Sequence, residues 1–234
     1  MLFGLLFMTS SLAGDCVRVS AREVGNIEAP AVVVLGERRG TPYDLWRANQ
    51  VVRKLSRRAP TTLALESAHH GRQSAIDRFA HGRTDLDTLE QELAWSDYWD
   101  FPFDPYRPLL RGAQRGVDLQ AVGVDRQPRP SDQPVPIPPG YFFILEEAFA
   151  SAPPPVMQED RLVEAIAYRD HRLARGALEA WSGEGYLVIL ADRFHVEGGK
   201  GISWQLKRMS PAPVHAFLLA DGGSACHPAD QILR

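Results

Sequence analysis

Five short apolar runs without polar alternation are spaced along the chain, and most are followed by a charged or turn residue. An uninterrupted apolar run of this length is typical of a strand buried on both faces, as in a parallel sheet covered by helices. The predicted strands span residues 31–35, 61–65, 117–122, 186–191 and 214–219.

Segments with helical periodicity separate these runs. Thr41-Pro42 provides an N-cap and a first-turn proline for a helix that carries Leu45, Ala48 and Val52 on one face. The longest helical pattern covers residues 157–181. This alternation predicts one α/β domain over residues 31–234, with three layers and a mostly parallel sheet that has helices on both faces. Residues 15–30 are polar and irregular, and we interpret them as a lead-in segment.

The first 14 residues are apolar and end in small side chains, which is typical of an export signal. The segment lacks a positive start and is too short to span a bilayer. The alternative is an apolar segment that packs on the domain. The stretch from Leu12 to Cys16 is close to a bacterial lipobox, although Asp15 interrupts it. Cys16 could therefore carry a lipid that anchors the protein to a membrane, or form a bridge with Cys226 in an oxidising compartment. Export would place the protein in a bacterial periplasm or at the outer membrane.

The net charge and the absence of certain motifs argue against several functions. The net charge is −3, and no basic stripe with interleaved aromatic residues is present, so nucleic acid is not an expected partner. The G-x-S-x-G nucleophile motif is absent. Gly198-Gly-Lys-Gly201 lacks the spacing of a phosphate-binding P-loop.

Three side chains suited to chemistry follow predicted strands. Glu37, Glu66 and His195 come after the first, second and fourth strand. The carboxyl ends of parallel strands meet at one edge of a sheet, so we expect a shared polar site there. Two carboxylates and an imidazole can bind a divalent metal or transfer protons. Taken singly, each residue would be an ordinary loop residue or helix cap.

Other polar residues have two interpretations each. Asp170 lies on the apolar face of the long helix, where a carboxylate needs a partner. That partner is Arg107 or Arg169 in an ion pair, or else a site residue that Asp170 orients. Arg107 begins a predicted helix. It would point at an anion or at one of the strand-end carboxylates, and the alternative is an exposed surface residue. The neighbouring residues His69 and His70 should point apart, so at most one would serve as a ligand.

Five motifs in order resemble those of the ChaN-like haem-binding uptake proteins, a family in the superfamily that includes the erythromycin esterases and the Tiki and TraB proteins. Val34-Leu-Gly-Glu37 resembles the opening LLGE-x-H, and Ala64-Leu-Glu66 resembles the LEM segment. The other three matches are Trp99 through Tyr106-Arg107-Pro-Leu, Arg169-Asp170 with Ala174, and Asp192-Arg-Phe-His195 with Gly201. The resemblance spans residues 32–219.

The sequence departs from the family pattern at three positions. Arg39 stands where the family has histidine, Asp192 where it has glycine, and Leu173 where it has methionine. Arg39 and Glu66 should follow neighbouring strands, so we predict that they form an ion pair. This pair would occupy the place of a metal, and we expect no catalytic metal, neither zinc nor manganese.

The resemblance implies an exported haem- or iron-associated binding protein, with homodimerisation left open. The alternatives are a hydrolase of the same fold that uses Glu37, Glu66 and His195, and an interaction module without catalysis. No Cys-x-x-Cys-His attachment motif is present, so haem would be held by an oxygen or imidazole donor. The candidate donors are Tyr98, Tyr106, His69 and His70, and the residues expected to contact a ligand also include Arg39, Arg107 and Asp170.

Overall fold

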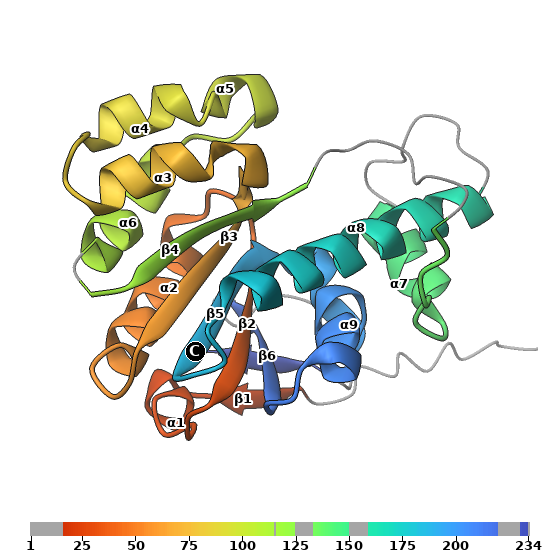
Figure 1. The fold of residues 1–234 in the computed structure, drawn as a ribbon. Helices are drawn as coiled ribbons and strands as arrows, with labels where there is room; N and C mark the ends of the chain where they lie inside the picture. Colours follow the sequence, from red (N-terminus) through yellow and green to blue (C-terminus); the bar gives the residue numbers. More distant parts are fainter. Residues whose placement is uncertain (1–15, 115, 125–132, 150–158, 220–229, 234) are drawn as a thin grey trace, which may run out of the picture.

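The chain folds around a seven-stranded sheet, shown in Figure 1 for a computed structural model. The structure describes residues 16–114, 116–124, 133–149, 159–219 and 230–233. The strands are β1 (Val17–Val19), β2 (Ala31–Glu37), β3 (Thr61–His69), β4 (Asp118–Gly123), β5 (Tyr186–Asp192), β6 (Val214–Leu219) and β7 (Gln231–Leu233). Their order is β1-β7-β6-β2-β5-β3-β4, and each neighbouring pair is parallel.

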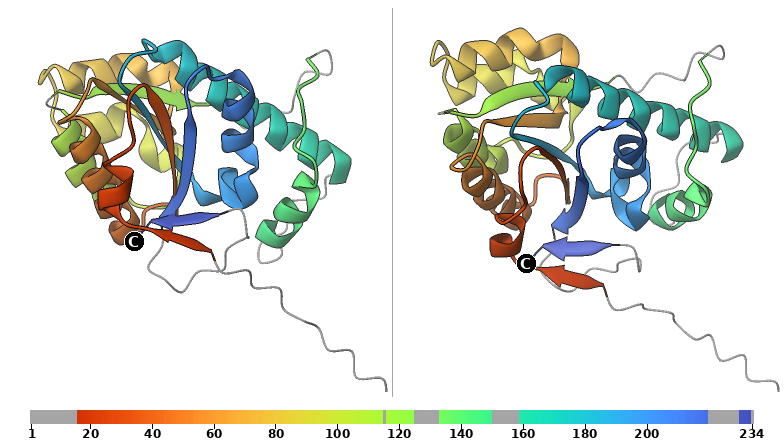
Figure 2. Two further views of the ribbon diagram at one scale, coloured as in Figure 1. Left: turned by 90° about the horizontal axis from the view of Figure 1, so that it is seen from below. Right: turned by 60° about the horizontal axis from the view of Figure 1, so that its bottom comes forward.

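Helices cover both faces of this sheet, as the views in Figures 1 and 2 show. The helices are α1 (Ala21–Val24), α2 (Pro42–Leu55), α3 (Gln73–Ala80), α4 (Leu86–Glu92), α5 (Trp95–Tyr98), α6 (Arg107–Ala113), α7 (Tyr141–Phe149), α8 (Glu159–Ala180) and α9 (Gly201–Met209). Helices α2, α3, α4 and α6 lie on one face, and α8 and α9 lie on the other.

Strand β2 shows why the sequence folds this way. Its residues are all buried, and alternate side chains enter different cores. Val33 and Leu35 belong to the core under α2, whereas Val32 and Val34 belong to the core under α8 and α9. Because both faces of the strand are covered, the apolar run needs no polar alternation. The predicted three-layer α/β fold is confirmed.

All five predicted strands are present, but two further strands escaped prediction. The segment interpreted as an irregular lead-in contains β1 and α1, and Ser20 and Glu23 form a capping box at the start of α1. Strand β7 lies close to the end of the chain and pairs with β1. Strands of three residues are too short to show a periodic pattern. Their pairing also joins segments more than 200 residues apart, which no local sequence pattern indicates.

The order of the strands differs from the expected one near the site. Strand β5 lies between β2 and β3 and pairs with both, so Glu37 and Glu66 do not follow neighbouring strands. Gly36 lets the chain after β5 pack closely over β2: a Cβ at this position would lie 3.1 Å from the Cα of Arg193. A short 3₁₀ turn, Arg193–His195, therefore sits directly over the carboxyl end of β2.

The predicted export signal lies outside the described residues, as does Cys226. Cys16 is disulfide-bonded. A sulfur in a disulfide cannot carry a lipid at the same time, so lipidation of Cys16 and this bridge exclude each other. Within the described part of the chain, no helix combines the length and the apolar character needed to cross a bilayer.

Candidate functional site

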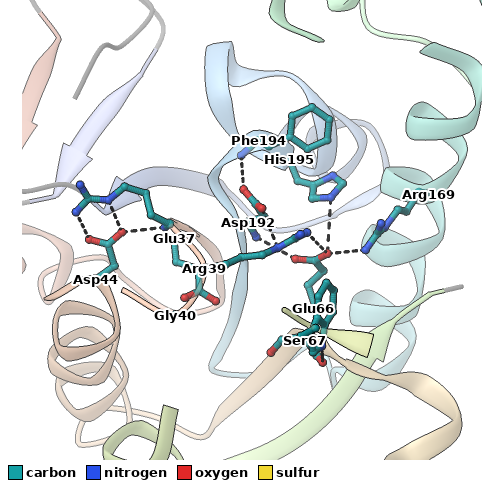
Figure 3. A network of polar contacts seen from close by, with 12 residues as sticks. Glu37, Arg39, Gly40, Asp44, Glu66, Ser67, Arg169, Asp192, Phe194 and His195 are labelled. Carbon is teal, nitrogen blue, oxygen red and sulfur yellow. Dashed lines mark hydrogen bonds and ion pairs between the residues drawn. The ribbon is translucent and has the colours of Figure 1, made fainter. Parts of the chain in front are cut away.

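The carboxyl ends of β2, β3 and β5 deliver a polar cluster to one edge of the sheet (Figure 3). Glu37 ends β2, Glu66 lies in the last part of β3, and Asp192 ends β5. His195 follows Asp192 in the 3₁₀ turn, and its Nε2 lies 3.7 Å from Oε1 of Glu66. The structure thus brings together the three residues that the strand ends predicted.

Glu66 is the centre of this cluster. Its Oε1 accepts hydrogen bonds from Arg169 at 2.7 Å and from Arg39 at 3.3 Å, and its Oε2 accepts one from the backbone N–H of Asp192 at 3.0 Å. Burial alone would raise the pKa of Glu66, but the charges of His195, Arg169 and Arg39 lower it to about 2. Glu66 is therefore an ionised anchor for cations and a poor proton acceptor.

Arg39 crosses the end of β5 to reach Glu66. Its Nε forms an ion pair with Oδ2 of Asp192 at 2.8 Å, and its guanidinium stacks on the ring of Trp99 at 4.7 Å. The predicted pair between Arg39 and Glu66 is confirmed, although the two strands are not neighbours. The long arginine side chain spans the intervening strand β5.

A buried chain of hydrogen bonds holds His195. Its Nδ1 lies 2.5 Å from Oδ1 of Asp170, and the other carboxylate oxygen of Asp170 accepts a hydrogen bond from Tyr141. Asp170 is fully buried, so these partners satisfy a carboxylate that would otherwise be costly. Asp170 therefore orients a site residue, His195, which is one of the two predicted alternatives. It does not pair with Arg169, which binds Glu66.

Glu37 is the uncharged member of the cluster. Burial raises its pKa to about 8, even though a hydrogen bond from Tyr106 at 2.6 Å acts in the opposite direction. The second carboxyl oxygen, Oε2, is buried and has no hydrogen-bond partner among the described residues. Tyr106, a predicted haem ligand, is itself buried and occupied by this contact.

Arg107 lies away from the site, contrary to the expectation that it points at the strand-end carboxylates. It forms ion pairs with Asp87 and Glu90 at 2.6 Å and with Asp104 at 2.8 Å. Position 107 begins α6, and the acidic side chains of α4 and of the preceding turn face that helix start.

Two pockets lie in this part of the molecule, and Glu66 and Arg169 of the cluster line the first of them. The first, here called the tyrosine pocket, has a volume of about 200 Å³. Its walls are Glu66, Ser67, His69, Leu93, Asp97, Tyr98, Trp99, Gly123, Val124 and Arg169. The second, the histidine–arginine pocket, has a volume of about 470 Å³. It is lined by His70, Ala121, Val122, Val124, Gln133, Pro134, Val135, Tyr168, His171, Arg172, Arg175, Gly176 and Glu179.

The two adjacent histidines line different pockets. His69 faces the tyrosine pocket and His70 the histidine–arginine pocket, yet their ring centroids are only 4.3 Å apart. They do not splay as expected for an extended chain, because the strand turns into a 3₁₀ helix at His70. In the part of the chain that the structure describes, no three His, Cys, Asp or Glu side chains form a group suited to a metal ion.

Several residues of the site were not predicted. Tyr141 closes the chain from His195, and Trp99 supports Arg39. His171 and Arg172 line the larger pocket. Trp99 belongs to one of the family motifs, and Tyr141 lies in an apolar helix with no local sign of its partner. His171 and Arg172 look like part of a solvated helix face, and their one signal is that they follow Arg169 and Asp170 in the sequence.

Comparison with known proteins agrees with the motif resemblance. Residues 24–130 match the family described as haem-binding uptake, Tiki superfamily, ChaN. This match covers 107 of the 234 residues, so it shows that this part of the chain is similar to ChaN proteins. No curated protein sequence matches the chain.

Solved structures with the same fold include a ChaN protein and two bacterial effectors. A structure described as cofacial haem binding to ChaN of Campylobacter jejuni is 18% identical, with 82% of each chain covered and a TM-score of 0.63. The type III effector HopBA1 is 15% identical, with 86% of each chain covered and a TM-score of 0.51. RRSP, a MARTX toxin effector domain from Vibrio vulnificus, is 15% identical with a TM-score of 0.51, and the match covers 91% of the ChaN-like chain and 39% of RRSP. At these identities the likeness concerns the fold.

Proposed function

We propose that this ChaN-like protein binds haem at the tyrosine pocket, with Tyr98 as the axial ligand. The observation that carries the proposal is the placement of Tyr98. Its side chain is 43% exposed at the pocket, and its ring stacks on that of His69 with centroids 5.9 Å apart and planes 12° from parallel. Phenolate oxygen is one of the established axial ligands of haem iron.

The chemistry of the pocket fits such a group. A haem site needs an apolar surface and one axial donor, because the porphyrin supplies the other ligands of the iron. Leu93 and Val124 provide apolar wall, and Trp99 provides an aromatic one. This need for a single donor also agrees with the lack of a three-residue metal group in the described chain.

The other predicted ligands fit less well. Tyr106 is buried and donates its hydrogen bond to Glu37. Nδ1 of His69 accepts a hydrogen bond from the N–H of Gly71, so the proton of the neutral ring lies on Nε2, which is buried. His70 lines the other pocket. Tyr98 is the one of the four whose donor atom belongs to an exposed side chain in the tyrosine pocket.

The size of the pocket supports contact with one face of the porphyrin. A pocket of about 200 Å³ is below the range of about 300–1,000 Å³ common for ligand sites. The structure of the Campylobacter protein is described as cofacial haem binding. We therefore propose that a second copy of the chain, with its own haem, covers the other face, so that haem binding and homodimer formation are linked.

Haem bound here would supply an iron centre for transport or storage, and the chain's own residues would position it. Trp99 is held by a hydrogen bond from its Nε1 to the carbonyl of Ser67 at 2.8 Å, and Arg39 stacks on its ring. These contacts fix one wall of the pocket. The disulfide of Cys16 supports export to an oxidising compartment, such as the periplasm, and not lipid anchoring through that residue.

The hydrolase alternative has less support from the geometry. His195 is oriented by Asp170 as a catalytic imidazole would be, but it is 1% exposed. Glu66 is engaged by two arginines, and Glu37 lines neither pocket beside the cluster. To transfer protons to a bound substrate, Glu37, Glu66 and His195 would all have to be accessible to that substrate from a pocket.

A haemin titration tests the proposal. Purified protein should bind haemin with a Soret shift, and Tyr98→Phe should weaken binding by more than about tenfold and change the spectrum. Tyr43→Phe on α2, at a half-buried position outside both pockets, is the matched control and should bind like the wild type. The proposal fails if Tyr98→Phe keeps the affinity and spectrum of the wild type. Sedimentation with and without haemin tests the dimer separately.

A further inference from the structure

We propose that the histidine–arginine pocket is a second binding site, which takes a small molecule carrying two or more carboxylate or phosphate groups. The pocket lies between β4 and α8 and is large enough for such a ligand, at about 470 Å³. Among the described residues, Val124 is the one that lines both this pocket and the tyrosine pocket, and this proposal does not depend on haem binding.

The charge of this pocket is opposite to that of the whole chain. The chain has a net charge of −3, whereas the pocket is lined by Arg172, Arg175 and two imidazoles, with Glu179 as its carboxylate. Glu179 is already engaged by Nε of Arg175 at 2.6 Å. The guanidinium of Arg172 is therefore left as a net positive charge in a concave site, and such a site concentrates anions.

Arg172 has a neutral partner. Its guanidinium donates to the hydroxyl of Tyr168 at 3.2 Å, and that hydroxyl donates to Oε1 of Gln133 at 3.0 Å. The Tyr168 ring lies 6.0 Å from the guanidinium carbon. A guanidinium is always charged and has five donors, so a phenol oxygen leaves most of its capacity for an anionic group.

Both histidines are oriented by neutral acceptors. Nδ1 of His70 lies 3.0 Å from the carbonyl oxygen of Gly123, which can only accept, so this nitrogen carries the proton. Nδ1 of His171 lies 3.3 Å from Oε1 of Gln205, whose Nε2 donates to the carbonyl of Pro136 at 2.8 Å. In each ring Nε2 is left for a ligand: it accepts from a hydroxyl group of the ligand when the ring is neutral, and it donates to an anionic group when the ring is protonated.

An anion fits these donors better than a bare metal ion. Two imidazoles fall short of the three protein donors that a metal site usually has, and the described residues contain no group of three metal-ligating side chains. The arginines would repel a cation. Arg172 can form paired hydrogen bonds with one anionic group of a ligand, and Arg175, one helical turn away, has N–H donors besides the Nε that binds Glu179 and can contact a second group.

Calorimetric titration of the haem-free protein with citrate and with inorganic phosphate tests the site. Arg172→Gln should weaken binding by roughly tenfold to a hundredfold, which is the usual effect of losing a charged hydrogen bond. Arg161→Gln on the exposed face of the same helix is the control and should bind like the wild type. Tighter binding of citrate would assign the site to polycarboxylates, and tighter binding of phosphate to phosphorylated ligands. Binding of neither, or equal binding by both variants, would overturn the proposal.

A second variant blocks the pocket without removing a contact. Gly176 lines it, and a Cβ at this position meets no atom within 4 Å, so Gly176→Leu should fold normally and exclude the ligand. Loading with haemin separates this proposal from the haem site. The anion should bind equally to haem-free and haem-loaded protein, and competition between them would show that the pocket is not a separate site.

Discussion

Two buried carboxyl groups at the same sheet edge have opposite ionisation. Glu66 meets two arginines and the N–H of Asp192, and these lower its pKa to about 2 against the effect of burial. Glu37 is equally buried, but its partner is the hydroxyl of Tyr106, and its pKa rises to about 8. A hydroxyl cannot supply the positive charge that an ionised carboxylate needs in a buried site. The partner, more than the depth, therefore decides which glutamate carries the charge.

Glu37 should make the protein less stable as the pH rises through neutrality. Its pKa is about 8 in the folded chain and near the ordinary 4.5 when unfolded, so its contribution is complete below pH 4.5 and declines until about pH 8. Between pH 6 and pH 8 this amounts to about 2 kcal/mol. Glu37→Gln keeps a neutral side chain of the same shape, so its unfolding free energy, measured in urea, should fall less over this range. An equal loss in both proteins would show that Glu37 is ionised.

Much of the site follows from single residues at strand ends. The positions of Glu37, Glu66 and His195 after apolar runs predicted that they share an edge, and the placement of Asp170 on an apolar face predicted a polar partner. Arg107 shows the limit of such reasoning, because its direction depends on the acidic residues of α4, which no local pattern reveals. Tyr141 is similar: it meets Asp170 only because α7 packs against α8.

At the scale of elements, local patterns predicted strands and helices but not their order. Strand β5 lies between β2 and β3 and pairs with both, although it is far from them in the sequence. The apolar run of a strand does not specify which other strand will lie beside it. Strand β4 ends the sheet on this side and shows how an exposed edge is protected. The amide of Gln73 accepts from the N–H of Ala121 at 2.7 Å and donates to the carbonyl of Leu119 at 3.0 Å. One side chain thus satisfies backbone groups that another strand could otherwise bind.

Gln73→Leu should destabilise the protein and promote association. The change leaves the N–H of Ala121 and the carbonyl of Leu119 without their partner, which costs about 1–3 kcal/mol for a buried group. Gln120→Leu on the same strand is the control, because among the described residues its amide donates to the side chain of Asp118 and to no backbone group. Urea unfolding and light scattering should separate the two variants. If they behave alike, the amide of Gln73 does not protect the edge.

At the scale of the whole molecule, the sheet separates the pockets from the strands at the chain ends. Strands β1 and β7 form one edge, and β4 forms the other, next to both pockets. The disulfide of Cys16 directly precedes β1. Strands β1 and β7 are therefore distant from the tyrosine pocket and from Tyr98, the proposed haem ligand.

Removing residues 1–19 should lower stability while leaving haem binding unchanged. The truncation removes β1, its ladder with β7 and the disulfide of Cys16, and it retains the capping box at Ser20. Loss of a disulfide costs about 2–4 kcal/mol, so the melting temperature should fall by about 5–15 °C in a chain of this size. Reduced full-length protein is the control for the disulfide alone and should fall by less, because it keeps the ladder. Haemin affinity, measured well below both melting temperatures, should match that of the full chain, since four strands lie between β1 and β3, the nearer of the two strands that line the tyrosine pocket. A truncated protein that folds but binds haemin more weakly would place the N-terminal segment in the binding site.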